Sequence, residues 1–191
     1  MPEWNLRINV PPTRRTPESL PSGLPGILVQ NDVPEGAQPD KNRSRGRPLA
    51  IVVHGSMAHK NALFYKDIAQ QVPMDSFRCD MRFVVSNQRR RRGSRKLGDE
   101  QHGRAFNTDQ DWASDLHAII AYLTTEFGYR VELMVGHSKG SFCMFGYLAN
   151  YCVPGAPQYQ PPPRLVVSIA GRFRMEVRLF WLTSAFMVSP T

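Results

Sequence analysis

The sequence is poor in the residues that build metal and cofactor sites, and its C-terminal end has little histidine or acid. No histidine follows Ser138, and Glu176 is the only acidic residue after it. The three cysteines, Cys79, Cys143 and Cys152, have neither CxxC nor other metal-ligand spacing. We therefore expect no metal and no cofactor. Two of these cysteines, at 79 and 143, lie in apolar segments where buried free thiols are common, which favours a reducing compartment.

Segments that direct a chain to a membrane are also missing. Residues 1–5 open the chain without the basic and apolar regions of a secretory signal. Residues 177–188 are apolar apart from Arg178, Thr183 and Ser184, and they are too short to span a bilayer. No internal repeat is present. We expect a soluble, cytoplasmic protein with no membrane span.

Charge is the unusual part of the composition. The chain has 191 residues, of which 41% are hydrophobic and 21% charged, as is ordinary for one globular domain. Its net charge of +8 can indicate an anionic partner. The excess is concentrated in residues 41–47 and 89–96, within stretches rich in Gly, Ser, Asn and Gln. Because no aromatic platform accompanies the arginines, solvated loops are favoured and a nucleic-acid partner is the least favoured reading.

Short apolar runs indicate strands. Residues 1–47 are rich in proline and contain two extended segments that suit edge strands, 4–10 and 26–30. The later strand-like runs are residues 48–53, 76–82, 131–135 and 165–170. The first of these four is continuously apolar, as expected of a strand buried on both faces of a parallel sheet, and the last is expected to be another buried strand.

Helix-like segments alternate with these strands. The first covers residues 62–72, with a partial stripe of Leu63, Phe64, Ile68 and Val72. The second starts near Asp109 and Asp111 and ends at Gly128, with apolar residues at helical spacing at positions 112, 116, 119, 120, 123 and 127. The third covers residues 141–151, with Phe142, Phe145 and Ala149 on one face. The alternation predicts an α/β domain with a parallel sheet.

The pentapeptide Gly136-His137-Ser138-Lys139-Gly140 lies between the third of the later strand-like runs and the last helix. Strand, G-x-S-x-G and helix in this order are the pattern of a nucleophile elbow, in which the serine hydroxyl projects above the sheet. The glycines on either side let neighbouring backbone pass closely. The backbone N–H of the residue after the serine then lies at a helix N-terminus, where an oxyanion would form.

A second oxyanion donor usually comes from the loop after an earlier strand. His54-Gly55-Ser56 follows residues 48–53 directly, so we assign the Ser56 N–H, with that of Met57 as the alternative. The expected oxyanion hole is therefore formed by the N–H groups of Ser56 and Lys139.

Residues 48–61, 76–82 and 133–140 together resemble the α/β-hydrolase superfamily, and most closely its serine aminopeptidase-like and esterase branch of fungi and plants. The resemblance covers about residues 48–171. It implies a mostly parallel sheet flanked by helices, with Ser138 as the nucleophile and Lys139 as the residue after it. His54 and Gly55 match the oxyanion-loop motif, and Gly136, His137 and Gly140 complete the elbow motif.

The sequence also departs from the family pattern. Residues 83–94 replace the Gly-rich turn that follows the second family strand, and residues 172–191 match no family segment. Family members continue beyond the strand matching 165–170 into strands that carry an acid and a histidine. We therefore expect three parts: an N-terminal proline-rich segment (1–47), a partial hydrolase core (48–171) and an atypical tail (172–191). The fold should be incomplete at its C-terminal end, with an exposed apolar sheet edge, in a truncated or mispredicted gene product.

The remaining histidines are weak substitutes for a catalytic base. His54 belongs to the oxyanion loop, His137 adjoins the serine, and His117 is expected on a helix surface. His59 and His102 lie in loops, and Asp80 is expected to have a structural hydrogen-bonding role. We predict a serine hydrolase by descent, acting on small ester or amide substrates, with negligible turnover in this chain. The alternative is a non-catalytic pseudoenzyme or binding module. The substrate and the oligomeric state stay open.

Overall fold

A computed structural model of the chain describes residues 1–12, 23–34, 36–56, 58–62, 64–81 and 109–171. Its strands are β1 (Glu3–Ile8), β2 (Leu24–Val29), β3 (Pro48–Val53), β4 (Asp75–Cys79), β5 (Arg130–His137) and β6 (Leu165–Ile169). Its helices are α1 (Lys41–Ser44), α2 (Tyr65–Gln71), α4 (Asp109–Glu126) and α5 (Lys139–Tyr151). The segments 83–94, 89–96 and 172–191, singled out in the sequence, lie outside the described residues.

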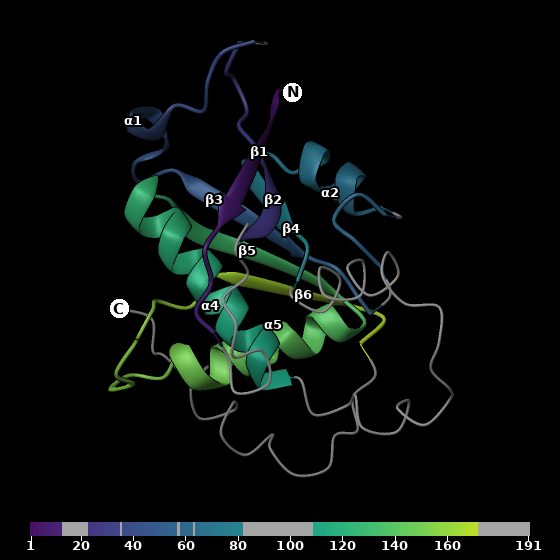
Figure 1. The fold of residues 1–191 in the computed structure, drawn as a ribbon, viewed down its shortest axis with the longest axis vertical. Coiled ribbons are helices and arrows are strands. Elements are labelled where there is room, and N and C mark those ends of the chain that lie inside the picture. The colour runs from purple at the N-terminus through teal and green to yellow at the C-terminus, as the bar shows by residue number, and fades with distance from the viewer. Residues whose placement is uncertain (13–22, 35, 57, 63, 82–108, 172–191) are drawn as a thin grey trace, which may run out of the picture.

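All six strands form one sheet in the order β1-β2-β4-β3-β5-β6 (Figure 1). The strands from β4 to β6 run parallel, whereas β1 and β2 pair antiparallel with their neighbours. In the register, Val53 at the end of β3 lies opposite Cys79 of β4 and Gly136 of β5. The carboxyl ends of the parallel strands therefore meet along one edge of the sheet, and the predicted mostly parallel α/β fold is confirmed.

The two N-terminal strands occupy different places. β1 is an edge strand, as predicted for residues 4–10, but β2 lies between β1 and β4 and so is not an edge. Proline is tolerated in β2 because the β2–β4 register begins at Gly26, one residue after Pro25. The Pro25 carbonyl accepts the N–H of Asp80 at 2.9 Å, which fixes the chain just beyond β4.

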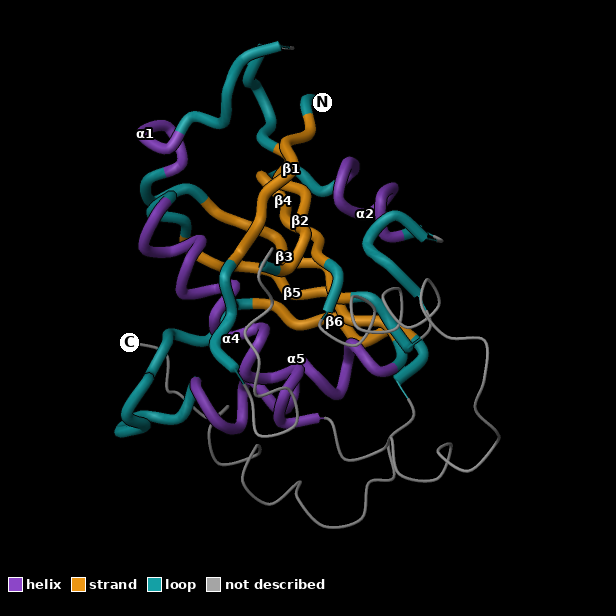
Figure 2. The backbone as a smooth tube through the Cα atoms, in the orientation of Figure 1, coloured by secondary structure: helices purple, strands orange, loops and turns teal. Residues whose placement is uncertain are grey.

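Helices cover both faces of the sheet (Figure 2). Side chains alternate between the faces of a strand, so Ile51 and Val53 of β3 pack into the large core beneath α4 and α5. Val52 points to the opposite face and packs with Tyr65 and Ala69 of α2. The central strand is therefore buried on both sides, as its uninterrupted apolar sequence predicted.

The α4 stripe is confirmed in full. The predicted residues are each at most 2% exposed, namely Trp112, Leu116, Ile119, Ile120 and Leu123 in the helix and Phe127 directly after it. The helix ends before Gly128, whose φ of +71° favours glycine and reverses the chain toward β5.

The face of α5 that packs on the sheet differs from the predicted one. Ala149 is exposed, while the buried residues of the helix are Gly140, Ser141, Cys143, Met144 and Tyr147. The predicted face was chosen by hydrophobicity alone. In the structure the elbow sets the rotation of the helix, because its first turn must pass close to the end of β3.

Helix α2 is shorter than the helix predicted for residues 62–72. α2 begins at Tyr65 rather than at residue 62, and it ends at Gln71, before Pro73. Its buried residues are Tyr65 and Ala69, one turn apart, which the expected stripe did not include, and Leu63 of that stripe lies outside the described residues. Phe64 and Ile68 are half-buried beside them.

The last strand is less buried than predicted. β6 is the end strand of the described sheet, and its residues are half-buried or exposed, with Leu165 57% exposed. The expectation of a buried strand is wrong for the residues described. Within the described sheet, β6 is instead an edge strand.

The basic residues of segment 41–47 are largely neutralised. Their carboxylate partners lie 2.9–3.6 Å away, in the pairs Lys41–Glu126, Arg43–Asp32, Arg47–Asp32 and Arg47–Asp75. This segment therefore presents less free positive charge than its composition indicates. In the described part of the chain, no helix combines the length and apolar character needed to cross a bilayer.

Candidate active site

Ser138 connects β5 to α5 in a conformation that side chains rarely adopt. Its φ is +51° and its ψ is −115°, so it lies outside the helical and extended regions. Such backbone costs about 1–3 kcal/mol and persists only where the surroundings impose it. The half-buried serine therefore occupies a strained strand-to-helix turn, as the G-x-S-x-G pattern predicted.

The neighbouring glycines make this turn possible. A Cβ at Gly136 would lie 2.5 Å from Met144 Cε, and one at Gly140 would lie 2.4 Å from the Val53 carbonyl oxygen. Real side chains do not tolerate such distances. A Cβ at Gly55 would lie 3.1 Å from Ser138 Cβ, so the loop after β3 passes directly against the serine.

Hydrogen bonds fix the elbow to β6. The Ser138 N–H donates to the Ile169 carbonyl at 2.9 Å, and the Ser141 N–H donates to the Ser138 carbonyl at 3.1 Å. The buried Ser141 hydroxyl donates to the Gly136 carbonyl at 2.9 Å and accepts from the Ser168 hydroxyl at 2.9 Å. Two serines that the sequence did not single out thus tie the elbow to the last strand.

His54 is a structural residue, and its two ring nitrogens are both engaged. Nε2 accepts the N–H of Met81 at 3.1 Å, so the ring proton is on Nδ1, which donates to the Gly55 carbonyl at 2.7 Å. Burial lowers the pKa of the His54 imidazole, so the ring is neutral near pH 7. His54 therefore joins the ends of β3 and β4 and is not placed to remove a proton from Ser138.

The loop after β3 is held by a buried carboxylate. Asp80 is 5% exposed and accepts the Lys60 backbone N–H at 2.6 Å and the Lys60 ammonium at 2.9 Å. The expected structural role of Asp80 is thus observed. The Gly55 N–H is also engaged, donating to the Tyr65 hydroxyl at 3.1 Å. Ser56 is exposed beyond it, while Met57 lies outside the described residues.

A buried arginine supports the same loop from β4. Arg78 is 1% exposed; its guanidinium donates to Glu3 at 2.9 Å and to the Asn61 side chain at 3.4 Å. Glu3 also accepts from Gln70 of α2 at 2.6 Å. The ion pair therefore links β1 to β4, and the hydrogen bonds of its two side chains extend this link to α2 and the loop. Nothing in the apolar periodicity indicated it.

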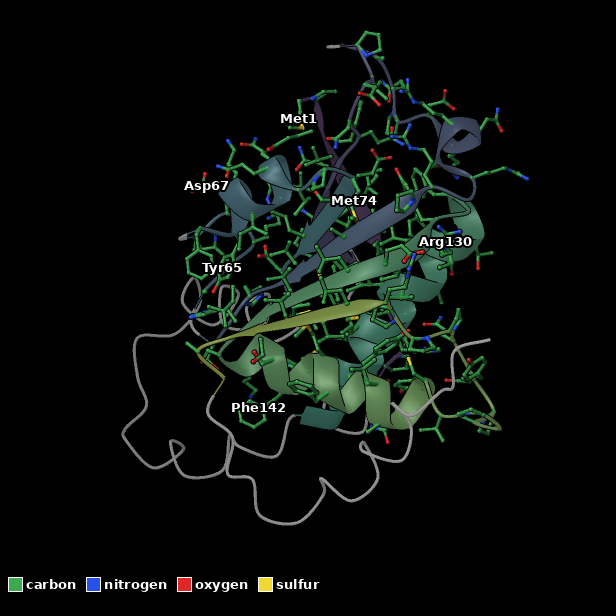
Figure 3. All side chains as sticks on the ribbon, turned by 180° about the vertical axis from the view of Figure 1, so that it is seen from behind. Met1, Tyr65, Asp67, Met74, Arg130 and Phe142 are labelled. Atoms are coloured by element: carbon green, nitrogen blue, oxygen red, sulfur yellow. The ribbon has the colours of Figure 1, made fainter. Side chains whose placement is uncertain are left out.

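The contact between Tyr65 and His137 is the one that the sequence least indicated. Tyr65 is 1% exposed, and its hydroxyl lies 2.7 Å from Nδ1 of His137. The His137 ring also meets the ring of Phe64 edge-on, with centroids 5.3 Å apart. Figure 3 shows Tyr65 at the carboxyl end of the sheet, opposite the end where Arg130 begins β5.

On the other face of the sheet, Trp112 of α4 lies beneath the site. Its ring meets His54 edge-on at a centroid distance of 5.8 Å, and the Lys139 ammonium lies 4.8 Å from its centroid. Lys139 is the first residue of α5. The helix N-terminus, which carries partial positive charge, therefore begins directly beside Ser138.

The other histidines lie elsewhere. Nδ1 of the exposed His59 accepts the Asn61 N–H at 3.2 Å. His117 is half-buried and stacked on Tyr151 at 4.0 Å, rather than lying on an open helix surface. His102 lies outside the described residues. Among the histidines that the structure describes, none hydrogen-bonds to Ser138.

Within the described ranges, no group of three or more His, Cys, Asp or Glu residues is arranged to hold a metal ion. The site residues are instead one hydroxyl, backbone N–H groups and a helix N-terminus. This set suits the capture of a developing negative charge on oxygen.

No family model and no curated protein sequence matches the chain. Solved structures do. A hydrolase candidate from Agrobacterium vitis S4 is 16% identical, with a TM-score of 0.52 over 90% of this chain and 53% of that protein. An α/β-hydrolase candidate of unknown function from Agrobacterium tumefaciens is 15% identical, with a TM-score of 0.51 over 92% of this chain and 64% of that protein.

The peroxisomal α/β-hydrolase Lpx1 from Saccharomyces cerevisiae is 14% identical, with a TM-score of 0.51 over 87% of this chain and 44% of that protein. The chain thus spans between about half and two thirds of the length of these proteins. At such low identity the similarity concerns the fold alone. The chain has the α/β-hydrolase fold.

Proposed function

We propose that Ser138 is the nucleophile of a serine hydrolase that acts on ester or amide bonds of small substrates in the cytoplasm, related to the serine aminopeptidase-like and esterase branch of fungi and plants. The observation that carries the proposal is the strained φ of +51° at Ser138, at the junction of a parallel strand and a helix. Backbone strain of this kind is concentrated at functional sites. Asp32 and Ala170 also have a positive φ, at +65° and +49°, but of these three residues only Ser138 lies within a G-x-S-x-G sequence.

In the proposed reaction, Ser138 Oγ attacks the carbonyl carbon of the substrate and the carbonyl electrons move to its oxygen. The N–H groups of Ser56 and Lys139 stabilise the resulting oxyanion. The assignment of Ser56 is supported by its neighbours, because the N–H of Gly55 already donates to Tyr65 and that of Ser138 to Ile169. An imidazole base must take the hydroxyl proton.

We expect this chain to turn substrates over very slowly. Hydrogen-bond reach is required of a base, and no described histidine bonds Ser138. An oxyanion hole without the full triad retains only a small part of the catalytic rate. The alternative function, a non-catalytic pseudoenzyme or binding module, differs in having no reactive serine at all.

Labelling with a fluorophosphonate in the presence of added imidazole tests the proposal. The serine oxygen bonds phosphorus, fluoride leaves, and imidazole takes the proton. We expect an adduct on the peptide containing Ser138 that forms faster as imidazole increases and is lost in Ser138→Ala. The matched control is Ser114→Ala on α4, which should label as the wild type does. Absence of an adduct at every imidazole concentration would reject the nucleophile and favour the binding module.

A further inference from the structure

We infer that Tyr65 is a positioning residue that locks the oxyanion loop to the nucleophile elbow through its single hydroxyl. The inference rests on the proposed function and adds to it a residue that neither the G-x-S-x-G motif nor the His-Gly motif contains. The phenolic oxygen lies 3.1 Å from the Gly55 nitrogen and 2.7 Å from Nδ1 of His137.

The two contacts are chemically compatible. A backbone N–H can only donate, so Gly55 donates to a lone pair of the phenolic oxygen. The phenolic proton then remains for Nδ1 of His137, which accepts it when the ring is neutral. Tyr65 is 1% exposed, so water has little access to replace either bond.

The bridge joins the neighbours of the two groups that must react together. Gly55 directly precedes Ser56, the proposed oxyanion donor, and His137 directly precedes Ser138, the proposed nucleophile. These two segments come from different strands, β3 and β5, and the loop has no sequence-local connection to the elbow. Fixing their separation is what an oxyanion hole requires, since its donors must be preorganised.

Tyr65 is itself held in place. It is the first residue of α2, and the next turn of that helix packs Ala69 against Val52 of β3. The Ser76 hydroxyl of β4 also donates to the Ala69 carbonyl. The phenol therefore projects from a helix that is fixed to the two central strands, and its hydroxyl has a defined position relative to both segments.

The test must separate the hydroxyl from the ring. Tyr65→Phe keeps the packing against Phe64 and His54 and removes only the bridge. Tyr147→Phe is the matched control, because Tyr147 is also 1% exposed and its hydroxyl loses its contacts with Gln160, at 2.8 Å, and with Cys152. Two readouts are measured on both variants: imidazole-assisted fluorophosphonate labelling of Ser138, and hydrogen exchange of the Gly55 amide.

In Tyr65→Phe, which removes both hydrogen bonds of the bridge, we expect labelling about tenfold slower. Exchange of the Gly55 amide should be about tenfold faster, because that amide loses its one buried hydrogen bond. Tyr147→Phe should match the wild type in both readouts. If Tyr65→Phe does not fold, His137→Leu serves instead. It removes one half of the bridge, and it should slow labelling while Gly55 stays protected.

If folded Tyr65→Phe labels at the same rate as the wild type, the role of Tyr65 is overturned and the proposed function is not. Equal slowing in Tyr65→Phe and Tyr147→Phe would also overturn it, because a general loss of stability would then explain the result. A wild-type chain that never labels would overturn the proposed function, and with it the catalytic meaning of the bridge. The exchange of Gly55 separates these cases, since it reports the bridge without any reaction at Ser138.

Discussion

Gly140 in the first turn of α5 packs against the carbonyl of Val53 at the end of β3. A Cβ at position 140 would lie 2.4 Å from that oxygen and 2.7 Å from the oxygen of His54. Both obstacles are backbone atoms, one in the last residue of the central strand β3 and one in the residue after it, and they cannot move aside as a flexible side chain can. This contact sets how closely the helix N-terminus approaches the sheet, and therefore where Ser138 and Lys139 lie.

Gly140→Ala should accordingly destabilise the protein by about 2 kcal/mol, in the range for overpacking a tight site. Urea denaturation gives the change in the free energy of unfolding. The control is Gly36→Ala, where nothing lies within 4 Å of an added Cβ and only the φ of +85° opposes the substitution. Its expected cost is about 1 kcal/mol. A smaller effect at position 140 than at position 36 would contradict the packing argument.

Glu3→Gln should destabilise the protein through the buried Arg78. The substitution keeps the shape of the side chain but removes the charge that faces a guanidinium only 1% exposed. Breaking a buried pair costs about 3–5 kcal/mol, and the 26% exposure of the Glu3 side chain reduces the expected value to roughly 2 kcal/mol.

A carboxylate whose arginine partners are exposed provides the comparison for this prediction. The Glu132 side chain is 12% exposed, but it pairs with Arg130 and Arg164, whose side chains are 62% and 84% exposed and keep their hydration when the charge is removed. Glu132→Gln should change stability by less than about 1 kcal/mol. Thermal unfolding of both variants under one buffer condition tests the difference, and equal losses would argue against a special role for Arg78.

Stability should fall in mildly acidic solution because of His54. Burial lowers the pKa of its imidazole below the ordinary value of 6.5, so the unfolded chain takes up the proton at higher pH than the folded chain does. The free energy of unfolding should therefore decrease as the pH falls below about 6.5, by at most about 1.4 kcal/mol per pH unit for one histidine.

Burial also lowers the pKa of His117, so the series is repeated in His117→Asn to isolate the part due to His54. Denaturation midpoints between about pH 8 and pH 5 give the slope. The resonance of His54 gives its titration directly. A slope near zero in His117→Asn below about pH 6.5 would show that His54 takes up its proton equally in both states.

Asp80→Asn should loosen the loop after β3. The amide oxygen can still accept one hydrogen bond, but the Lys60 ammonium loses its counter-charge in a site where Asp80 is 5% exposed. We expect a loss of about 1–3 kcal/mol and faster amide exchange at Lys60. Asp67→Asn, an exposed change on α2, is the control and should cost only a few tenths of a kcal/mol. Unaltered exchange at Lys60 would contradict the anchoring role.

Local pattern was enough to predict much of the fold. The run of residues 48–53 became β3 without a shift at either end, and the stripe of α4 is buried throughout. Both signals are repeated along a whole element, so no single tertiary contact can override them. The elbow could be predicted for a different reason. Its conformation depends on glycine, serine and their spacing within five consecutive residues.

Contacts between segments far apart in the chain could not be predicted in this way. Tyr65 touches His137 across 72 positions, and Arg78 meets Glu3 across 75. In the sequence, Tyr65 is an aromatic residue within an expected helix, and Arg78 is a charged residue within an expected strand. The buried face of α5 was missed because backbone clearance at Gly140, rather than side-chain hydrophobicity, decides its rotation.

The attachment of the elbow to β6 has a consequence for synthesis of the chain. Ser138 bonds Ile169, and Ser141 bonds Ser168 across 27 positions, so these contacts form only after the last described strand has left the ribosome. All other strands of the sheet are translated before it. Domains fold largely from the N-terminus as they emerge, so the strained serine turn lacks its final support in the nascent protein. The proposed nucleophile therefore acquires the last of its described supports after the rest of the sheet has been made.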